Sequence, residues 1–316
     1  MTVLAVAHRG HRGLFAFAVA MAVLTPVLAV LAVVDDRVLL GAPLWFKPLK
    51  FAISLALYAA TLSWMLGQLR ERTLARTGWI VTAAAAIEMA VIVGQAAVGN
   101  RSHYNMDTPL SAALWGTMGV TIVVLWLATL AVALRFLREP GRDRAATTAI
   151  RLGLVVALIG LAEGFLMATA ATHTVGAPDG GPGLPLLGWS TVGGDLRIAH
   201  FVGLHALQVL PLLAALLVRR GVGDPARVVW SVAAGYLGVV VLLLWQALRA
   251  QPLLAPDARR ARCGGARLPR DPAPAGPGVS PTTPSPLGFL SHLLVRIPFR
   301  HEARQPGRDA QTATAR

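Results

Sequence analysis

The sequence predicts an all-α membrane protein, a polytopic transmembrane helix bundle of about seven spans with its N-terminus in the cytoplasm. Hydrophobic residues make up 55% of the 316 residues and charged residues only 14%, whereas roughly 25% are charged in an average soluble domain. The apolar residues gather in runs of about 20, the length that crosses a hydrocarbon core of ~30 Å. Arginine recurs between alternate runs, which is typical of a multi-pass chain.

Each predicted span is an apolar run that begins and ends at charged, Gly or Pro residues. The first run follows a short arm, 1–13, and is too long for a signal peptide, so we interpret it as a retained span. Pro48 suits the first turn of the second helix, and Asp195 stands at an N-cap position before the sixth. The predicted spans cover residues 14–34, 48–67, 79–98, 110–134, 149–171, 198–218 and 228–248.

The connections after the second, fourth and sixth spans are rich in arginine, and the alternate connections hold less of it. Cytoplasmic loops of membrane proteins carry an excess of basic residues. This distribution places the N-terminus in the cytoplasm and the opposite helix ends outside. The expected location is the plasma membrane.

The C-terminal residues 249–316 have a different composition, rich in Pro, Gly, Ala and Arg. They hold eleven arginines and four acidic residues, and the resulting charge of +7 is half of the net charge of +14. Such a segment buries too little apolar surface to offset its ordering entropy, so we predict a disordered basic tail. The remaining positive charge lies mainly in short loops, which favours a lipid bilayer and no nucleic acid as the partner. Cys263, the single cysteine, excludes an intrachain disulfide.

Unusual polar residues concentrate at the predicted outer ends of the spans. Of the 29 basic residues only Lys47 and Lys50 are lysines, and three residues of separation put them on similar faces of the second helix. One interpretation is a cationic lining for an anionic ligand. The other is a pair of lysines that reach to the membrane interface beside a tryptophan.

Two acidic residues, Glu88 and Glu163, lie inside predicted spans. A carboxylate in hydrocarbon costs roughly 3 kcal/mol on insertion scales, so such groups normally face a bundle interior or water and have partners. Gln95 follows Glu88 by seven residues and shares its helix face. Glu163 falls at the depth of His205, which makes these two residues expected partners. The alternatives are interhelical hydrogen bonds or a proton pathway.

Four of the eight histidines lie at outer ends: His103, His173, His200 and His205. Imidazoles on different helices are what b-type haem ligation in a bundle requires, with nearby Arg and Lys for the propionates. A metal ion held by His and carboxylate groups is a second option. The third is that each histidine is simply hydrogen-bonded within the structure. The remaining candidate ligand or cavity residues are Lys47, Lys50, Glu88, Gln95, Arg101, Asn105, Glu163, Asp195, Arg197 and Gln208.

The connection 172–197 is longer than ordinary loops, and such loops are usually functional or disordered. Its apolar LPLLGW core favours a loop that folds back over the helix ends. Asp195 could pair there with Arg197 or with a lysine. The chain has no Walker A motif, no GxSxG, no GxGxxG after a strand and no CxxCH.

Three segments, FKPLKF (46–51), GQAAVGNRSHYN (94–105) and GGDLRIAHFVGLHALQ (193–208), resemble an uncharacterised family of bacterial multi-pass membrane proteins. The resemblance covers residues 14–248 and implies a class without an activity. Three functions follow from the polar residues: a b-haem membrane oxidoreductase or electron carrier, a transporter or sensor for an anionic or proton-coupled ligand, and a structural or assembly protein. In the second, Glu88, Glu163 and His205 would relay protons.

Overall fold

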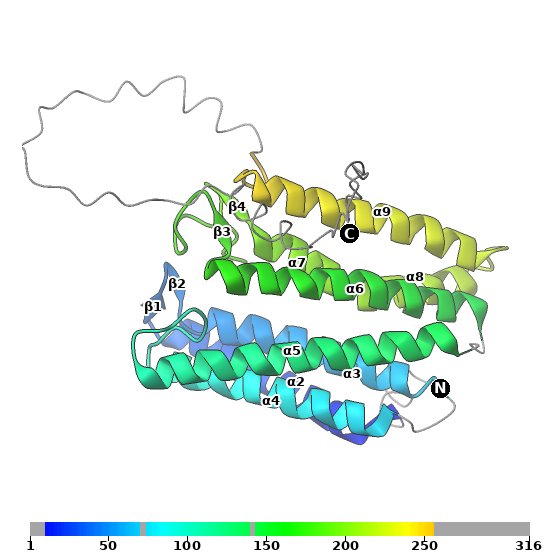
Figure 1. Ribbon diagram of the computed structural model, residues 1–316, viewed down its shortest axis with the longest axis horizontal. Coiled ribbons are helices and arrows are strands. Elements are labelled where there is room, and N and C mark those ends of the chain that lie inside the picture. Colours follow the sequence, from blue (N-terminus) through cyan, green and yellow to red (C-terminus); the bar gives the residue numbers. More distant parts are fainter. Residues whose placement is uncertain (1–9, 70–73, 140–142, 256–316) are drawn as a thin grey trace, which may run out of the picture. The chain divides into compact units, whose positions relative to one another are not determined.

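The computed structural model describes residues 10–69, 74–139 and 143–255, all within the first of two compact units, Met1–Ala266. These residues form eight α-helices (Figure 1): α2 (Arg12–Val34), α3 (Phe46–Leu66), α4 (Ala75–Ala97), α5 (Pro109–Arg138), α6 (Arg144–Ala170), α7 (Leu196–Leu204), α8 (Ala206–Arg219) and α9 (Pro225–Leu248). The predicted tail lies outside the described residues from 256 onward.

Six of these helices are long and apolar enough to cross a membrane, and the bent pair α7 and α8 makes a seventh if it is one span. The predicted class, an all-α polytopic bundle, is therefore confirmed. Large apolar side chains cover the outer faces, among them Val33, which is 81% exposed, and Val23, which is 64% exposed. Lipid chains solvate such faces, whereas water would not.

Several helices extend beyond the predicted spans at the ends that bear arginine. α4 begins at Ala75 and α6 at Arg144, earlier than the apolar runs suggest. Asp143 caps α6 by accepting hydrogen bonds from the amides of Ala145 and Ala146. The extension is favourable because a capped turn can lie in the interface while arginine side chains reach toward water.

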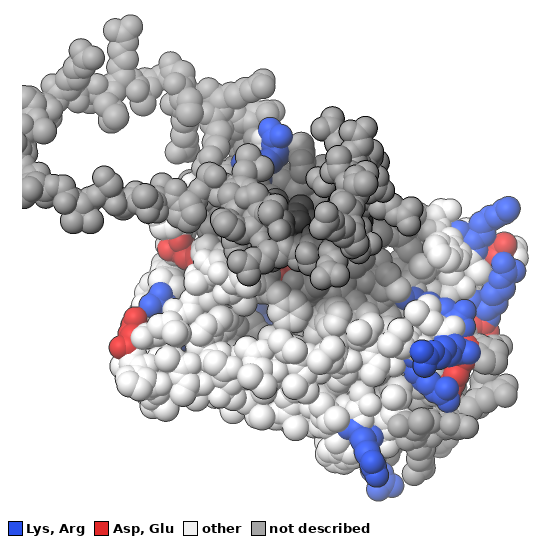
Figure 2. All heavy atoms as spheres, in the orientation of Figure 1, with Lys and Arg blue, Asp and Glu red and all other residues white. Residues whose placement is uncertain are grey.

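The helix ends fall into two groups with different chemistry. One, which we call the Arg-rich end, holds most of the described arginines: Arg12, Arg76, Arg135, Arg138, Arg144, Arg219, Arg220 and Arg227. Blue side chains gather at the right of Figure 2. The other, the loop end, carries two short antiparallel hairpins (Figure 1): β1 (Val38–Leu39) with β2 (Ala42–Pro43), and β3 (Thr174–Val175) with β4 (Gly194–Asp195).

Helix α6 joins the two parts of the bundle. The largest apolar cluster unites α2 to α5 with one face of α6, through residues such as Ile150 and Leu154. Three smaller clusters pack the opposite face of α6 against α7, α8 and α9, in layers that contain Ala149, Val156 and Met167. Both faces of α6 are therefore buried, and it positions the helices on either side.

Helices α6 and α7 make a close backbone contact at two glycines. A Cβ placed on Gly160 would lie 2.6 Å from the Cα of Gly203 and 2.6 Å from the amide nitrogen of Leu204. Small residues allow such backbone contact, which supplies dispersion energy where the lipid offers no hydrophobic driving force. No side chain fits between the two helices at this level.

The predicted sixth span is broken at His205, where α7 and α8 meet at a bend of 41°. Pro211 lies inside α8, and it removes the amide that would bond the carbonyl of Leu207. Gly203 adds backbone freedom one turn earlier. The hydroxyl of Tyr236 donates to the carbonyl of Val202 at 2.6 Å, so α9 satisfies a polar backbone group beside the break.

His11 belongs to the fold, although the sequence assigned it to a terminal arm. It is 6% exposed and caps α2, because its Nδ1 accepts a hydrogen bond from the amide of Leu14. Its Nε2 contacts the carbonyl of Ala75 at 2.9 Å, and its own amide donates to Ser63. His11 therefore ties α2 to α3 and α4 at the Arg-rich end.

Candidate functional site

Basic and histidine side chains from four segments meet at the loop end. We call them the loop-end cluster: Lys47 and Lys50 of α3, His103 of the α4–α5 connection, His173 after α6, and Arg197 of α7. Lys47 interacts electrostatically with Lys50 and Arg197, and with both histidines. The structure thus brings together residues that the sequence only grouped by membrane side.

Asp195 and Arg197 form the ion pair that was expected from the sequence. The Arg197 guanidinium donates to both carboxylate oxygens of Asp195, at 2.9 and 2.6 Å. Asp195 also caps α7 by accepting from the amide of Arg197, and it accepts from the amide of Ser190 at 2.8 Å. The side chain of Asp195 has no exposed surface, so its negative charge is compensated within the protein by Arg197 and by backbone amides.

The loop 172–197 folds back over the end of α3, as its apolar centre suggested. The ammonium of Lys50 donates to the carbonyl of Leu187 at 2.9 Å, and Arg197 donates to the carbonyl of Gly188 at 2.6 Å. Gly41, in the turn of the β1–β2 hairpin, has no room for a Cβ because the carbonyl oxygen of Gly180 would lie 2.7 Å away. Two cations and one hairpin therefore hold the loop in place.

Lys47 differs from its neighbours in the cluster. It is half-buried, yet among the described residues its ammonium forms no hydrogen bond or ion pair. Its electrostatic neighbours Arg197 and Lys50 are both positive, and only Glu88 opposes them. A desolvated ammonium among cations is unfavourable unless an anion compensates it.

His103 lies among aromatic rings. Its ring centroid is 5.7 Å from that of Phe51, 6.0 Å from Tyr104 and 5.4 Å from Trp115. Its Nδ1 contacts the hydroxyl of Ser102 at 3.1 Å. Burial, followed by the positive charge of Lys47, lowers the pKa of His103 well below its usual range, so this imidazole is neutral at physiological pH.

His173 is held by the loop that it begins. Its Nδ1 lies 3.2 Å from Asp179 and 3.1 Å from the hydroxyl of Thr174. Burial lowers the pKa of His173, Arg197 adds to the effect, and Asp179 opposes it. The net direction is toward a neutral ring, which keeps positive charge at the cluster confined to the lysines and Arg197.

Two residues of this site were missed by the sequence reasoning, Tyr104 and Asp179. Asp179 organises the start of the loop by accepting from the Thr172 hydroxyl at 2.9 Å and the Thr174 amide at 3.0 Å. Tyr104 packs on Trp115 with centroids 5.1 Å apart, and burial together with Asp179 raises its pKa to about 12. Tyr104 has a positive φ of 57°, and no sequence pattern predicts this conformation.

The acid and amide predicted on α4 both face the interior. Glu88 is 5% exposed and Gln95 is 6% exposed. The hydroxyl of Thr121 on α5 donates to Glu88 at 2.6 Å, and Glu88 interacts electrostatically with Lys47. The expected polar stripe on α4 is thus buried, and Glu88 lies at its deeper end.

Arg101 and Asn105 form their contacts within the α4–α5 connection. The amide group of Asn105 donates to the carbonyl of Arg101 and accepts from the amide of Asp107. Arg101 pairs with Asp107 at 3.3 Å, and both side chains are well exposed. These contacts stabilise the α4–α5 turn, and Arg101 does not enter the electrostatics of Lys47.

His200, His205 and Gln208 form a separate polar group at the bent helix. His200 Nδ1 contacts the carbonyl of Gly160 on α6 at 2.7 Å. His205 Nδ1 contacts Gln208 at 3.1 Å, and Gln208 donates to Thr61 on α3 at 3.0 Å. His200 and Gln208 therefore join helices, and His205 bonds within its own segment, in line with the structural alternative for these histidines.

Glu163 does not contact His205, so the expected partnership is wrong. Both carboxylate oxygens of Glu163 are buried without a hydrogen-bond partner in the described part of the chain. The depth argument assumed a straight sixth helix, whereas α7 ends at the bend where His205 lies. His205 instead bonds within its own segment.

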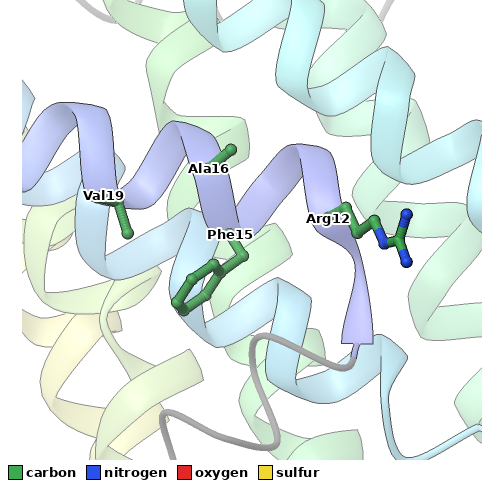
Figure 3. Close-up of a pocket in the computed structure, with 4 residues that line it drawn as sticks. All are labelled: Arg12, Phe15, Ala16 and Val19. Atoms are coloured by element: carbon green, nitrogen blue, oxygen red, sulfur yellow. The ribbon is translucent and has the colours of Figure 1, made fainter.

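Within residues 10–69, 74–139 and 143–255, no group of three or more His, Cys, Asp or Glu residues could hold a metal ion. A hollow of about 430 Å³ lies on α2 at the Arg-rich end, lined by Arg12, Phe15, Ala16 and Val19 (Figure 3). A small one of about 10 Å³ lies between α7 and α9. Neither is lined by Lys47, so a polar cavity formed by the candidate residues at the outer helix ends stays a prediction.

No family model, curated protein or solved structure matches this chain. The resemblance carried by the segments 46–51, 94–105 and 193–208 therefore remains a prediction. The loop-end cluster contains residues from all three of these segments. The function must accordingly be argued from the site itself.

Proposed function

We propose that this multi-pass membrane protein binds a small anionic ligand at the loop end, as a transporter or a sensor. The observation that carries the proposal is Lys47, a half-buried ammonium among cations with no hydrogen-bond or ion-pair partner in the described residues. Asp195 cannot supply the missing charge, because Arg197 and two backbone amides already hold its carboxylate. A carboxylate or phosphate group would compensate Lys47.

The loop 172–197 supports the proposal because it lies over this site and is held partly by the site's own cations. Lys50 and Arg197 donate to consecutive loop carbonyls, of Leu187 and Gly188. A competing anion would draw these donors away and release the loop. The loop thus acts as a cover whose closure depends on the ligand.

The side of the membrane follows from the Arg-rich end, which we propose lies in the cytoplasm of a bacterial cell with the loop end outside the plasma membrane. Leu186 is 73% exposed at the tip of the loop. Leu186→Cys in a Cys263→Ser background should react with an impermeant thiol reagent added to intact cells. Labelling only after lysis would reverse the orientation.

Haem binding by the histidines gains less support from the geometry. The backbones of α6 and α7 touch at Gly160 and Gly203, so a planar macrocycle does not fit between these helices beside His200. His103 is already packed against three aromatic rings. The anion site therefore accounts for the loop-end cluster better than bis-histidine ligation does.

The experiment is thermal unfolding of the detergent-purified protein with phosphate, sulfate or citrate, against chloride at equal ionic strength. A ligand at 100 times its Kd stabilises by about 2.7 kcal/mol, which corresponds to a Tm increase of roughly 5–10 °C at about 2–4 °C per kcal/mol. Lys47→Gln should abolish the increase. Arg249→Gln, which removes one positive charge that does not interact with Lys47, should retain it.

Two results would contradict the proposal. One is a wild-type protein whose Tm responds to none of these anions. The other is an equal response in Lys47→Gln and Arg249→Gln, which would show general screening of positive charge and no defined site.

A further inference from the structure

The carboxyl group of Glu163 has an environment unlike that of the other buried polar groups. Glu163 is 3% exposed, and its two oxygens are the buried side-chain polar atoms left without a hydrogen-bond partner in the described part of the chain. Glu88, the other acid within a span, accepts a hydrogen bond from Thr121. Glu163 therefore needs a ligand or a change of charge to be accommodated.

The position of Glu163 on α6 shows what surrounds it. Val156 and Met167 lie seven residues before it and four after it, so all three share one helix face. Val156 packs in an apolar layer with α8 and α9, and Met167 packs in one with α7 and α9. The Glu163 side chain lies between these layers and faces the seam of α6, α7 and α9.

The titratable groups of the neighbouring helices either bond to other groups or lie at the Arg-rich end. On α7, His200 contacts a backbone carbonyl of α6, and Arg197 pairs with Asp195. On α9, Tyr236 donates to a backbone carbonyl of α7. The charged residues of α5 and α8 lie at the Arg-rich end. None of these groups donates a hydrogen bond to Glu163 or pairs with it.

An ionised carboxylate with no donor and no counter-ion is strongly unfavourable in apolar surroundings, and protonation removes the charge. We infer that Glu163 is a proton-binding site of the membrane domain, which keeps its proton while α6, α7 and α9 are packed together and exchanges it when that seam opens. This site is separate from the anion site at Lys47 and does not depend on it.

A small hollow between α7 and α9 lies next to the apolar layer that a proton must cross to reach Glu163. Its volume of about 10 Å³ is close to the space of one water molecule. It is lined by Asp195, Gln246 and Gln251, and also by Ala247, a member of the Met167 layer. Met167 follows Glu163 by one helical turn toward the loop end, so this layer lies between Glu163 and the hollow, and movement of α7 or α9 would open it to protons.

Infrared spectroscopy of the full-length protein in phosphatidylcholine vesicles at neutral pH tests this inference. The wild-type protein should show a protonated-carboxyl carbonyl band that shifts in D₂O. Glu163→Gln should lose that band, and Glu88→Gln should retain it. If Glu163→Gln does not fold, Glu163→Asp provides the assignment, because it should keep the band at a shifted frequency.

Three results would overturn the inference. The first is a spectrum in which Glu163→Gln removes no protonated-carboxyl band, and the second is an unshifted band in Glu163→Asp. The third is loss of the band when sodium replaces choline at constant ionic strength, which would make Glu163 a sodium site. An anion-insensitive Tm would bear on Lys47 alone and leave this site unaffected.

Discussion

Replacement of Gly160 by alanine tests whether the contact between α6 and α7 holds the two parts of the bundle together. The new Cβ would lie 2.6 Å from two backbone atoms of α7, at Gly203 and Leu204. Backbone atoms cannot rotate away, so the helices must separate, and the hydrogen bond between His200 and the Gly160 carbonyl must lengthen. Overpacking of this kind costs about 1–3 kcal/mol.

The matched control is Gly119→Ala on α5, where no atom of a neighbouring element lies within 4 Å of the new Cβ. That change should be neutral or stabilising, because alanine is favoured over glycine in helices by up to about 1 kcal/mol. At roughly 2–4 °C per kcal/mol, Gly160→Ala should lower Tm by about 2–12 °C in detergent, followed by circular dichroism. Equal Tm values for the two variants would refute the contact.

Two further predictions concern the histidines. Because burial lowers the pKa of His103 and His173 in the folded protein, the unfolded chain binds more protons as the pH falls below about 6.5. The stability that depends on these neutral, buried imidazoles is therefore present above that pH and lost below it. His103→Phe should make the fall of Tm toward pH 5 shallower. An unchanged slope of Tm against pH would contradict the burial of His103. Protein purified from haem-supplied cells should show no Soret band, since α6 and α7 touch beside His200; a Soret band that His200→Ala abolishes would restore the haem hypothesis.

Much of the fold was predictable because the signals are local. Runs of about 20 apolar residues identify spans whatever the helices pack against, and the structure places a helix at every predicted span. Asp195 and Arg197 were also predictable as a cap and an ion pair, since they are two residues apart at a helix start. The bend at His205 lies one to two turns before Pro211, and a hydropathy pattern does not reveal it.

The candidate site was predictable only as a set of residues on one membrane side. Residue type and membrane side identified one group of residues, because polar side chains at the ends of membrane spans are unfavourable unless they have partners. The group is Lys47, Lys50, His103, His173 and Arg197. Arg101 belonged to the same set by this criterion, yet it pairs with Asp107 in its own turn. Sequence spacing cannot tell a residue of the loop-end cluster from one that pairs within its own turn, because the geometry of the turn decides whether Arg101 lies nearer to Asp107 or to the cluster.

The sequence by itself therefore determined the class of protein, the approximate positions of its apolar helices, and the chemistry available at each end. Only the tertiary structure decided that Lys50 holds the loop, that Lys47 has no partner among the described residues, and that Glu163 faces an apolar seam instead of His205. Those outcomes depend on the rotation and bending of helices relative to one another. Packing contacts between residues distant in the sequence, such as Gly160 and Gly203, determine both.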